Sequence, residues 1–402
     1  MRRSRPAAVI VLAAGEGTRM RSARPKVLHE IAGRSLLGHA IAAARGLEPL
    51  HLVVVVRHER DAVVDHLAAI APDVVVADQD EVKGTGRAAS CGLAALGGVA
   101  ELSGTVVVTY GDVPLLTTTT LRELVEVHEA GGDAVTVLTA ELADPTGYGR
   151  VLRDADGAVA AIVEQKDATP EQAAVAEVNT GIYAFDAAFL ADALGRLTTD
   201  NAAGEAYLTD VVAMARSGGH AVHAVLVEDA RETEGDNDRI QLAGLGRVLR
   251  DRLVEGWMRA GVTVVDPQTT WLDAGVELAA DVTLLPGTQL LGSTSVASGA
   301  TVGPDTTLLD CTVGPQATVL RSHATGADIG ARASVGPFAY LRAGTVLGAD
   351  GKIGAYVETK NAVIGTGSKV PHLTYVGDAE IGEGTNIGAA TIFVNYDGEA
   401  KH

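Results

Sequence analysis

The second half of the chain contains a short repeat, which constrains the fold more tightly than any other feature. Aliphatic residues recur every six positions, and glycine follows many of them. The recurring positions form runs that change phase after Leu308, Ile353 and Val376, and they are Leu290, Val296, Val302, Leu308, Ile329, Val335, Leu341, Leu347, Ile353, Ile364, Val370, Val376, Ile381 and Ile387. One inward aliphatic residue per hexad predicts a parallel β-helix, in which each short strand stacks on the coil before it.

Length and composition set limits on the rest of the chain. At 402 residues the sequence is too long for one ordinary core, which predicts two domains. With 47% hydrophobic and only 3% aromatic residues, the cores must consist of Ala, Val, Leu and Ile. A net charge of -19 argues against nonspecific nucleic-acid binding, so an anionic substrate must be attracted by a local basic cluster. One such cluster comprises Arg19, Arg21, Arg24 and Lys26.

The cysteines and the amino-terminal segment indicate a cytoplasmic protein. Cys91 and Cys311 are far apart and lack metal-ligand spacing, so we interpret both as small buried residues of a reduced protein. The segment M-R-R-S-R-P-A-A-V-I-V-L-A-A-G superficially resembles a signal peptide. Its apolar run is short, however, and leads directly into a glycine turn. It therefore predicts a first strand, and we expect no association with a membrane.

That first strand enters a glycine-rich turn, L-A-A-G-E-G-T-R-M-R-S-A-R-P-K, at residues 12–26. Backbone N–H groups at the end of a strand allow phosphates to approach closely, and Gly15 and Gly17 permit the turn. Arg19 and Lys26 add two positive charges beside it. A Gly-x-Gly turn alone is equally consistent with a tight loop before a helix. The Thr-Arg and Pro-Lys pairs that follow favour nucleotidyl transfer.

The motif L-A-A-G-x-G-T-R-M followed by P-K resembles the signature of the sugar-nucleotide pyrophosphorylases, and the Walker lysine-serine pair of ATPases is absent. The resemblance implies that Arg19 and Lys26 are catalytic. It also implies that UTP is bound by Leu12, Ala13, Ala14, Gly15 and Lys26.

Strand-like and helical patterns alternate through the first half of the chain. Apolar runs at 51–56, 73–77 and 105–110 alternate with helical periodicity at 35–45 and 61–70. This rhythm predicts an α/β, Rossmann-like domain with a doubly wound, mostly parallel sheet. Ligands then belong at the carboxyl ends of the strands.

Two loops after these strands fit that expectation. Q-D-E-V-K-G-T-G-R-A, from Gln79, reads alone as a glycine turn that opens a helix, but it matches the pyrophosphorylase pattern and implies that Gln79, Gly84 and Thr85 contact the base. The next strand ends on Tyr110-Gly111-Asp112, a second predicted part of the UTP site. An aspartate just past a parallel strand can cap a helix or hold a hard cation against phosphates. The family's G-D-x-P-L pattern favours the cation.

Four motifs in the middle of the chain read from their residues alone as polar loop edges between strands. They are D-P-T-G-Y-G-R-V (144–151), I-V-E-Q-K-D-A-T (162–169), E-V-N-T-G-I-Y (177–183) and E-A-Y-L-T-D (205–210). In this order they resemble the bifunctional bacterial N-acetylglucosamine-1-phosphate uridyltransferase and glucosamine-1-phosphate acetyltransferase family. The resemblance implies that Gly149, Glu164 and Asn179 hold the sugar.

The same resemblance implies a magnesium-dependent synthesis of UDP-N-acetylglucosamine, a precursor for peptidoglycan. An oxygen of N-acetylglucosamine 1-phosphate attacks the α-phosphorus of UTP, and pyrophosphate leaves. Mg²⁺ is held by Asp112 and Asn237. The family usually has an apolar residue where this chain has Asp236, and an extra carboxylate there can strengthen metal binding or face solvent. We expect it to face solvent.

Between the two patterns, residues 240–259 place Leu245, Val248, Leu249, Leu253 and Trp257 at helical spacing, and Gly261 ends the run. We therefore expect a uridyltransferase domain at 1–239, a linker helix at 240–262 and a β-helix at 263–402.

The repeat is similar to that of the hexapeptide acyltransferases, whose β-helices are left-handed against the general rule for parallel crossovers. Such proteins commonly form homotrimers with active sites between subunits. In S-K-V-P-H-L-T-Y-V-G-D (368–378), His372 is either structural or a general base that deprotonates an attacking amine. The match to the family's H-L-T-Y-x-G-D, with V-N-Y-D-G at 394–398, favours catalysis.

The resemblance also assigns substrates to the β-helix. Glucosamine 1-phosphate would be bound by Arg342, Lys360, Tyr375, Asn386 and Asn395, and the acetyl-CoA side would include Ala389, Tyr396 and Lys401. The family continues for several coils beyond His402, so we expect a complete uridyltransferase and an impaired acetyltransferase. Two alternatives stay open: a pyrophosphorylase for another sugar with a regulatory β-helix, and a β-helix that serves only to assemble trimers.

Overall fold

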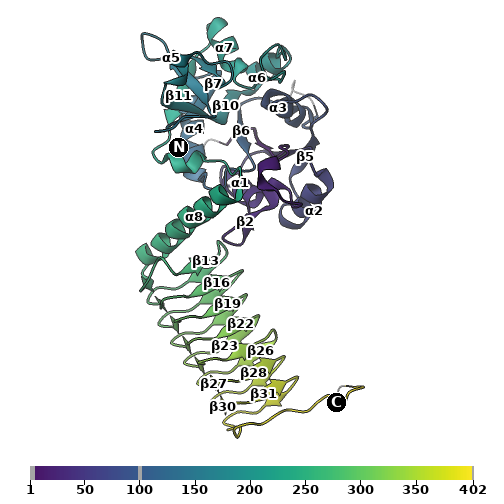
Figure 1. Ribbon diagram of the computed structural model, residues 1–402, viewed down its shortest axis with the longest axis vertical. Coiled ribbons are helices and arrows are strands. Elements are labelled where there is room, and N and C mark those ends of the chain that lie inside the picture. Colours follow the sequence, from purple (N-terminus) through teal and green to yellow (C-terminus); the bar gives the residue numbers. More distant parts are fainter. Residues whose placement is uncertain (1–4, 98–101, 401–402) are drawn as a thin grey trace. The chain divides into compact units, whose positions relative to one another are not determined.

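The computed structural model describes residues 5–97 and 102–400, and the chain divides into two compact units. Unit 1 comprises Met1–Glu30 and Ser35–Leu245, and unit 2 comprises Ile31–Arg34 and Gly246–His402. The division falls within helix α8 (Arg239–Arg259), which confirms the helix expected between the two sequence patterns (Figure 1).

Unit 1 is built on a mixed β-sheet with the strand order β11-β7-β10-β6-β1-β4-β5. The strands are β1 (Ala8–Leu12), β4 (His51–Val56), β5 (Val75–Asp78), β6 (Thr105–Tyr110), β7 (Val135–Glu141), β10 (Glu177–Asp186) and β11 (Val222–Leu226). β6, β1, β4 and β5 are parallel, as predicted, whereas β10 runs antiparallel to both β6 and β7. The motif at 177–183 therefore lies inside a strand, and its prediction as a loop edge was wrong.

Two core clusters lie on opposite faces of this sheet because successive side chains of a strand alternate between faces. In β1, Val9 and Val11 belong to one cluster, and Ala8, Ile10 and Leu12 belong to the other. The first face packs against α1 (Leu36–Arg45), α2 (Arg60–Ile70) and α4 (Thr118–Gly131). The second packs against α3 (Thr85–Ala94), α6 (Ala187–Leu194) and α7 (Asp210–Ser217). The fold thus has three layers and is of the predicted α/β, Rossmann-like class, although its sheet is mixed.

Smaller elements complete the described part of unit 1. The strands β8 (Gly149–Arg153) and β9 (Val159–Val163) form an antiparallel pair, and β8 also pairs with β10. The strands β2 (Glu30–Ile31) and β3 (Arg34–Ser35) form a short pair. Residues Ile31–Arg34 of this pair are assigned to unit 2, and Glu30 and Ser35 to unit 1. The short helices are η1 (Thr18–Met20), η2 (Lys26–Leu28), α5 (Pro170–Ala173) and η4 (Ala230–Thr233).

Unit 2 is a left-handed parallel β-helix whose described strands form three seven-stranded parallel sheets. The first contains β12 (Thr263–Val264), β15 (Thr283–Leu284), β18 (Thr301–Val302), β21 (Thr318–Val319), β24 (Ser334–Val335), β27 (Lys352–Ala355) and β30 (Lys369–His372). The second contains β13 (Trp271–Leu272), β16 (Gln289–Leu291), β19 (Thr307–Leu309), β22 (His323–Thr325), β25 (Tyr340–Leu341), β28 (Glu358–Lys360) and β31 (Tyr375–Gly377). The third contains β14 (Glu277–Leu278), β17 (Ser295–Val296), β20 (Thr312–Val313), β23 (Ala327–Ile329), β26 (Thr345–Leu347), β29 (Val363–Ile364) and β32 (Glu380–Ile381).

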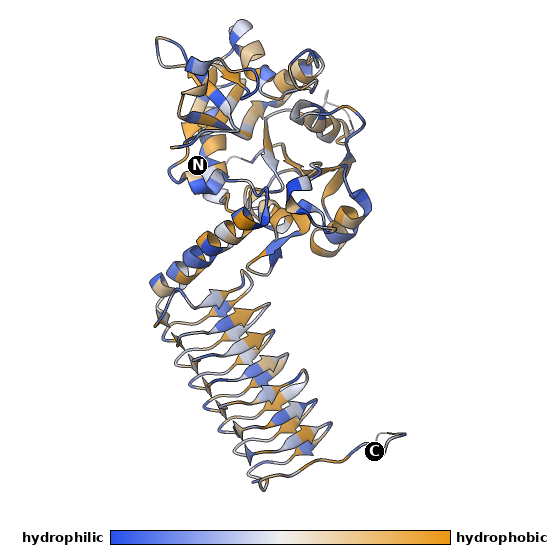
Figure 2. Cartoon of the chain, viewed as in Figure 1, coloured by the Kyte–Doolittle hydropathy of each residue, from blue (hydrophilic) through white to orange (hydrophobic). Residues whose placement is uncertain are grey.

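The aliphatic repeat fills the interior of this β-helix. Leu284, Val302 and Val319 pair in register on successive coils, and all three are buried. Every predicted repeat position from Leu290 to Ile381 belongs to one core cluster, and the partly buried Ile387 packs against it. Figure 2 shows hydrophobic residues on the strands interleaved with hydrophilic ones, as expected for strands with one face inside and one outside.

The cysteines only partly follow the prediction. Cys311 is buried in the β-helix core, but Cys91 on α3 is half-buried, so its prediction as a buried residue was wrong. Both are free thiols. Across the described residues, the structure contains no helix with the length and apolar character needed to cross a membrane.

Candidate active sites

A cavity of about 440 Å³ lies in unit 1 at the carboxyl ends of its parallel strands. It collects side chains that directly follow β1, β4, β5 and β6, which is where ligands bind in such sheets. The predicted UTP-binding residues that line it are Leu12, Ala13, Ala14, Gly15, Lys26, Gln79, Gly84, Thr85, Tyr110 and Asp112. Gly111 does not line the cavity, and its amide instead donates to the Leu12 carbonyl at 2.9 Å, tying β6 to β1.

The glycine-rich turn positions two cationic side chains. Gly17 has a φ of 61°, and a Cβ atom there would lie 2.5 Å from Lys26 Cβ, so only glycine lets the two segments pack. Helix η1 begins immediately after Gly17 and presents Arg19. Arg239 Nε donates to the Met20 carbonyl at 3.2 Å and fixes the end of this helix.

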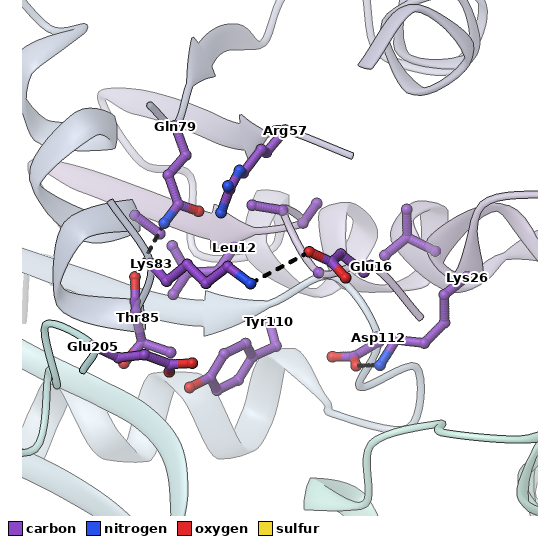
Figure 3. Close-up of a pocket in the computed structure, with 16 residues that line it drawn as sticks. Leu12, Glu16, Lys26, Arg57, Gln79, Lys83, Thr85, Tyr110, Asp112 and Glu205 are labelled. Atoms are coloured by element: carbon purple, nitrogen blue, oxygen red, sulfur yellow. Dashed lines mark hydrogen bonds and ion pairs between the residues drawn. The ribbon is translucent and has the colours of Figure 1, made fainter. Parts of the chain in front are cut away.

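The most enclosed ion pair of the cavity joins Lys26 Nζ to Asp112 Oδ2 (Figure 3). The side chains are only 13% and 21% exposed, so the pair is shielded from solvent more than a surface salt bridge. Lys26 begins η2, and Asp112 follows the end of β6. The pair therefore holds the glycine-rich segment against the carboxyl end of β6.

Asn237, the second predicted metal ligand, is held by local contacts at the start of α8. Its amide donates to Gln241 Oε1 at 2.9 Å, and Asp238 Oδ1 accepts from the amides of Ile240 and Gln241. The Asn237 side-chain oxygen accepts from Arg19 Nη2. The oxygens of Asp112 and Asn237 thus each meet a cationic side chain, and carboxylate and amide oxygens are donors that Mg²⁺ accepts.

A second cavity of about 260 Å³ adjoins the first and contains all three predicted sugar-binding residues, Gly149, Glu164 and Asn179. Three residues line both cavities: Thr85, Tyr110 and Glu205. The Asn179 side-chain oxygen accepts from the Gly181 amide at 2.9 Å and the Tyr183 hydroxyl at 2.8 Å. Its NH₂ group is therefore the part that can donate to a ligand.

Tyr110 forms the wall between the two cavities. A Cβ atom at Gly181, whose φ is 79°, would lie 2.1 Å from Tyr110 Cε2, so this glycine makes room for the ring. Burial raises the pKa of Tyr110 well above its ordinary value, and the Asp112 carboxylate raises it further. The phenol consequently stays neutral and can serve only as a hydrogen-bonding group.

Sequence reasoning missed several residues that line the cavities. Arg57, Lys83 and Glu16 line the first cavity, and Lys83 Nζ lies 3.8 Å from Glu16 Oε1. Arg57 directly follows β4, and this position at the carboxyl end of a predicted strand was a signal that could have found it. The motif at 205–210 was noted without a role, and its Glu205, Tyr207, Leu208 and Thr209 line the second cavity.

Arg150 is a further residue that the sequence did not single out. It is only 1% exposed, and its guanidinium donates to the carbonyls of Tyr148 and Ala173 and to Gln165 Oε1. Gln165 Oε1 also accepts from the Gly147 amide at 3.1 Å. Arg150 therefore fixes the loops that carry Tyr148 and Gly149 into the second cavity.

The prediction that Asp236 faces solvent was wrong. The residue is 0% exposed, and neither carboxylate oxygen has a hydrogen-bond partner. Burial raises the pKa of Asp236 to about 6, while the nearby Lys26 ammonium lowers it and the Asp112 carboxylate raises it. The physical reason is its backbone path, since the Asp236 amide donates to the Asp112 carbonyl at 3.0 Å and draws the residue inward.

In unit 2, the predicted glucosamine 1-phosphate ligands gather on consecutive coils. Lys360 pairs in register with Gly377, and the Arg342 amide donates to the Thr359 carbonyl. Arg342 Nη1 lies 3.2 Å from Glu358 Oε1, and Lys360 Nζ lies 3.7 Å from Asp378 Oδ2.

The remaining predicted ligands follow in the next coils. The Asn395 side-chain amide donates to the carbonyls of Gly377 and Asp378, and Tyr375 stands beside Gly377. Asn386 forms a parallel bridge with Lys369.

The predicted general base His372 is exposed at the end of β30, and its carbonyl accepts from the Ala390 amide, next to the predicted Ala389. The Tyr396 hydroxyl donates to the Gly398 carbonyl at 2.8 Å. The structure places these residues near one end of the β-helix, and their roles stay predictions. Lys401 lies outside the described residues.

Comparison with known proteins finds similar proteins whose matched regions include both units. Residues 9–252 match the family of MobA-like NTP transferase domains. The chain is 63% identical over 397 residues to the bifunctional protein GlmU of Pseudarthrobacter chlorophenolicus, covering 99% of the chain and 81% of the relative. Identity to the GlmU of Kineococcus radiotolerans is 64% over 396 residues, covering 98% and 80%. For Streptomyces coelicolor it is 58% over 399 residues, covering 99% and 82%.

The half-buried Glu164 leads to a prediction about stability. Burial raises the pKa of Glu164 above its ordinary value of 4.5, so the unfolded chain releases this proton at a lower pH than the folded chain. The ionised carboxylate therefore destabilises the folded state at neutral pH, and this penalty vanishes at a pH below 4.5. Glu164→Gln should raise the thermal midpoint of unit 1 by about 1 to 4 °C at about pH 7 and leave it unchanged at about pH 4.

Calorimetry at the two pH values measures this difference, and Glu205→Gln in the same cavity is the matched control. A lower midpoint for Glu164→Gln at neutral pH would contradict the assignment of burial as the dominant influence on this carboxyl.

Proposed function

The chain belongs to the family of bifunctional GlmU proteins, which combine a uridyltransferase with a glucosamine-1-phosphate acetyltransferase, and from that premise we propose which residues carry out each reaction. Unit 1 catalyses transfer of UMP from UTP to N-acetylglucosamine 1-phosphate, which yields UDP-N-acetylglucosamine and pyrophosphate. Unit 2 takes part in acetyl transfer from acetyl-CoA to glucosamine 1-phosphate.

The observation that supports the first assignment best is the pair of adjoining cavities. The nucleotide occupies the cavity of the glycine-rich turn, with the base near Gln79 and Gly84, and the sugar occupies the cavity of Glu164 and Asn179. Because Thr85, Tyr110 and Glu205 border both, the sugar phosphate and the α-phosphate of UTP meet beside Tyr110 and Asp112. The enzyme then acts mainly by positioning two anions against each other.

The chain's own cations supply the electrostatic part of catalysis. Lys26 and Arg19 are paired with Asp112 and Asn237, so they can turn toward the phosphates once those oxygens take another cation. A Lys and an Arg on the α-phosphate and the leaving pyrophosphate stabilise the charge that develops there. Backbone amides of the turn at 12–15 contact the phosphates from the other side.

Asp112 and Asn237 are the residues that would hold Mg²⁺. Their side-chain oxygens already accept from cationic groups, which fits a site that attracts cations. When bound, Mg²⁺ neutralises phosphate charge and polarises the α-phosphate.

Unit 2 provides a phosphate-binding pair for the second reaction. Arg342 and Lys360 bring fixed positive charge to neighbouring coils, with Tyr375, Asn386 and Asn395 nearby as polar ligands. His372 is the proposed general base for the attacking amine, and Ala389 and Tyr396 lie on the acetyl-CoA side.

We further propose a cytoplasmic homotrimer assembled through the β-helix. Analytical ultracentrifugation should give a mass three times that of the chain, and a monomer would contradict the trimer. Following thiol release from acetyl-CoA on the same sample distinguishes an acetyltransferase from a β-helix that only assembles subunits.

Lys26 and Lys83 offer a matched pair of lysines for testing the uridyltransferase site. Lys26 is 13% exposed and paired with Asp112, whereas Lys83 is 57% exposed and faces Glu16. Lys26→Gln should lower kcat for pyrophosphate release from UTP and N-acetylglucosamine 1-phosphate by about 10²- to 10³-fold, because it removes a preorganised charge from the phosphates. Lys83→Gln should change kcat only a few-fold.

Equal effects of the two substitutions would argue against the role of Lys26. Repeating the assay with glucose 1-phosphate tests the alternative sugar, and faster turnover of that substrate would support a different pyrophosphorylase.

Arginines of the β-helix allow a similar comparison for unit 2. Arg342 belongs to the proposed site. Arg332 lies outside the proposed set of ligands, and its Nη2 atom is 2.6 Å from Asp350 Oδ2. Arg342→Gln should weaken glucosamine 1-phosphate binding roughly tenfold or more, since a charge-assisted hydrogen bond to phosphate is lost. Isothermal titration calorimetry measures the affinity, and Arg332→Gln should leave it unchanged. The opposite ranking would place the phosphate elsewhere.

A further inference from the structure

Asp236 is a buried carboxylate that the proposed mechanism does not use. It is fully enclosed, and neither of its oxygens accepts a hydrogen bond. Burying an ionised carboxylate without a partner is strongly unfavourable unless a cation lies close by. An apolar side chain of similar size would avoid the penalty. The position therefore calls for a cation that offsets the charge.

The backbone places this carboxylate beside the candidate metal ligands. The Asp236 amide donates to the Asp112 carbonyl at 3.0 Å, and a Cβ atom at Gly235 would lie 3.8 Å from Asp112 Oδ2. Residues 235–237 thus run along Asp112, with Asn237 immediately following. The Asp236 carboxyl is attracted electrostatically by Lys26 and repelled by Asp112 and, from the residue directly before α8, by Asp238. It therefore belongs to the same group of charges.

The balance of charge in this group favours a further cation. Asp112 alone is neutralised by Lys26, and Asn237 has a neutral side chain that accepts from Arg19. In the free enzyme, Lys26 and Arg19 carry two positive charges, against one carboxylate charge from Asp112 without Asp236 and against two with it. Asp236 therefore removes a net positive charge that would repel a divalent ion. Coulomb attraction for a divalent ion then increases in proportion to the added charge.

We propose that Asp236 adds a second carboxylate charge to the divalent-cation site of Asp112 and Asn237. The free enzyme then binds the metal before it binds UTP. This inference rests on the proposed function of unit 1. Sites with one or two carboxylates usually bind Mg²⁺ together with substrate phosphates. We expect the second carboxylate charge to raise the metal affinity of the free protein above that of a site with Asp112 alone. Asp236 is in this account a positioning residue, which acts on the metal through the field of its charge.

The test is a titration of the free protein with Mn²⁺, followed by electron paramagnetic resonance without nucleotide at about pH 8, where ordinary carboxylates are ionised. Asp236→Asn removes the charge and keeps the shape, and Asp236→Val replaces the carboxylate with an apolar side chain. Both should weaken Mn²⁺ binding about tenfold or more, equivalent to about 1.4 kcal/mol. Asp238→Asn is the matched control, because it removes a neighbouring charge but keeps an oxygen that caps α8, and it should change the affinity less than about twofold.

Asp112→Asn separates this inference from the function on which it rests. Loss of Mn²⁺ binding in Asp112→Asn, with wild-type affinity in both Asp236 variants, would overturn the role of Asp236 and leave the metal site intact. Wild-type affinity in Asp112→Asn would overturn the metal site itself. Absence of Mn²⁺ binding to the wild-type protein until UTP is added would also contradict the proposal.

Thermal unfolding of each variant shows whether it folds. Removing a buried, unpaired carboxylate should leave the melting temperature of the Asp236 variants equal or higher. Weaker Mn²⁺ binding in a variant of undiminished stability is an effect that a merely structural role would not produce.

Discussion

The ion pair between Lys26 and Asp112 is the interaction on which the nucleotide site depends. It joins the glycine-rich segment to the end of β6, and both side chains are largely shielded from solvent. Gly17 makes the approach of the Lys26 stem possible, and the Gly111 amide fixes β6 against β1 behind it. The ion pair joins two loops that line the cavity. In the proposed mechanism Lys26 contacts a phosphate and Asp112 a metal ion, so each would exchange its present partner for a new one during catalysis.

Around this pair, the site contains buried polar groups. Burial raises the pKa values of Glu164 and Tyr110, and for Glu164 this lowers the stability of the folded state at neutral pH. Arg150 is buried among carbonyls and one side-chain amide that accept its hydrogen bonds. The β-helix of unit 2 is built differently, because its interior is aliphatic and its charged residues pair on the outside of successive coils.

Much of this architecture could be predicted from local patterns. A hexad of aliphatic residues admits few folds, so the positions from Leu290 to Ile381 were identified as core. The glycine-rich turn and Asp112 were found because each directly follows an apolar run that had to be a strand. The sugar-binding residues of the second cavity were predicted only from the motif resemblance, because their spacing in the sequence does not indicate a mechanism.

The incorrect predictions share one physical cause. Packing between segments that are distant in sequence overrides what the local composition indicates. The segment at 177–183 is polar enough to read as a loop, but neighbouring strands on both sides make it part of β10. Asp236 reads as exposed because it is charged, whereas its backbone hydrogen bond to Asp112 draws it inside. Arg150 gains its role from contacts with Gln165 and Ala173, whereas Arg57 could have been found from its position directly after a predicted strand.

In the proposed function, nucleotide and sugar occupy two adjoining cavities that meet at Tyr110 and Asp112. A crystal structure of the protein with UDP-N-acetylglucosamine tests it most directly. We predict the uracil near Gln79 and Gly84, the diphosphate beside Lys26 and Asp112, and the N-acetylglucosamine ring between Glu164 and Asn179. A sugar ring bound outside the cavity of Glu164 and Asn179, or a uracil in that cavity, would contradict the account.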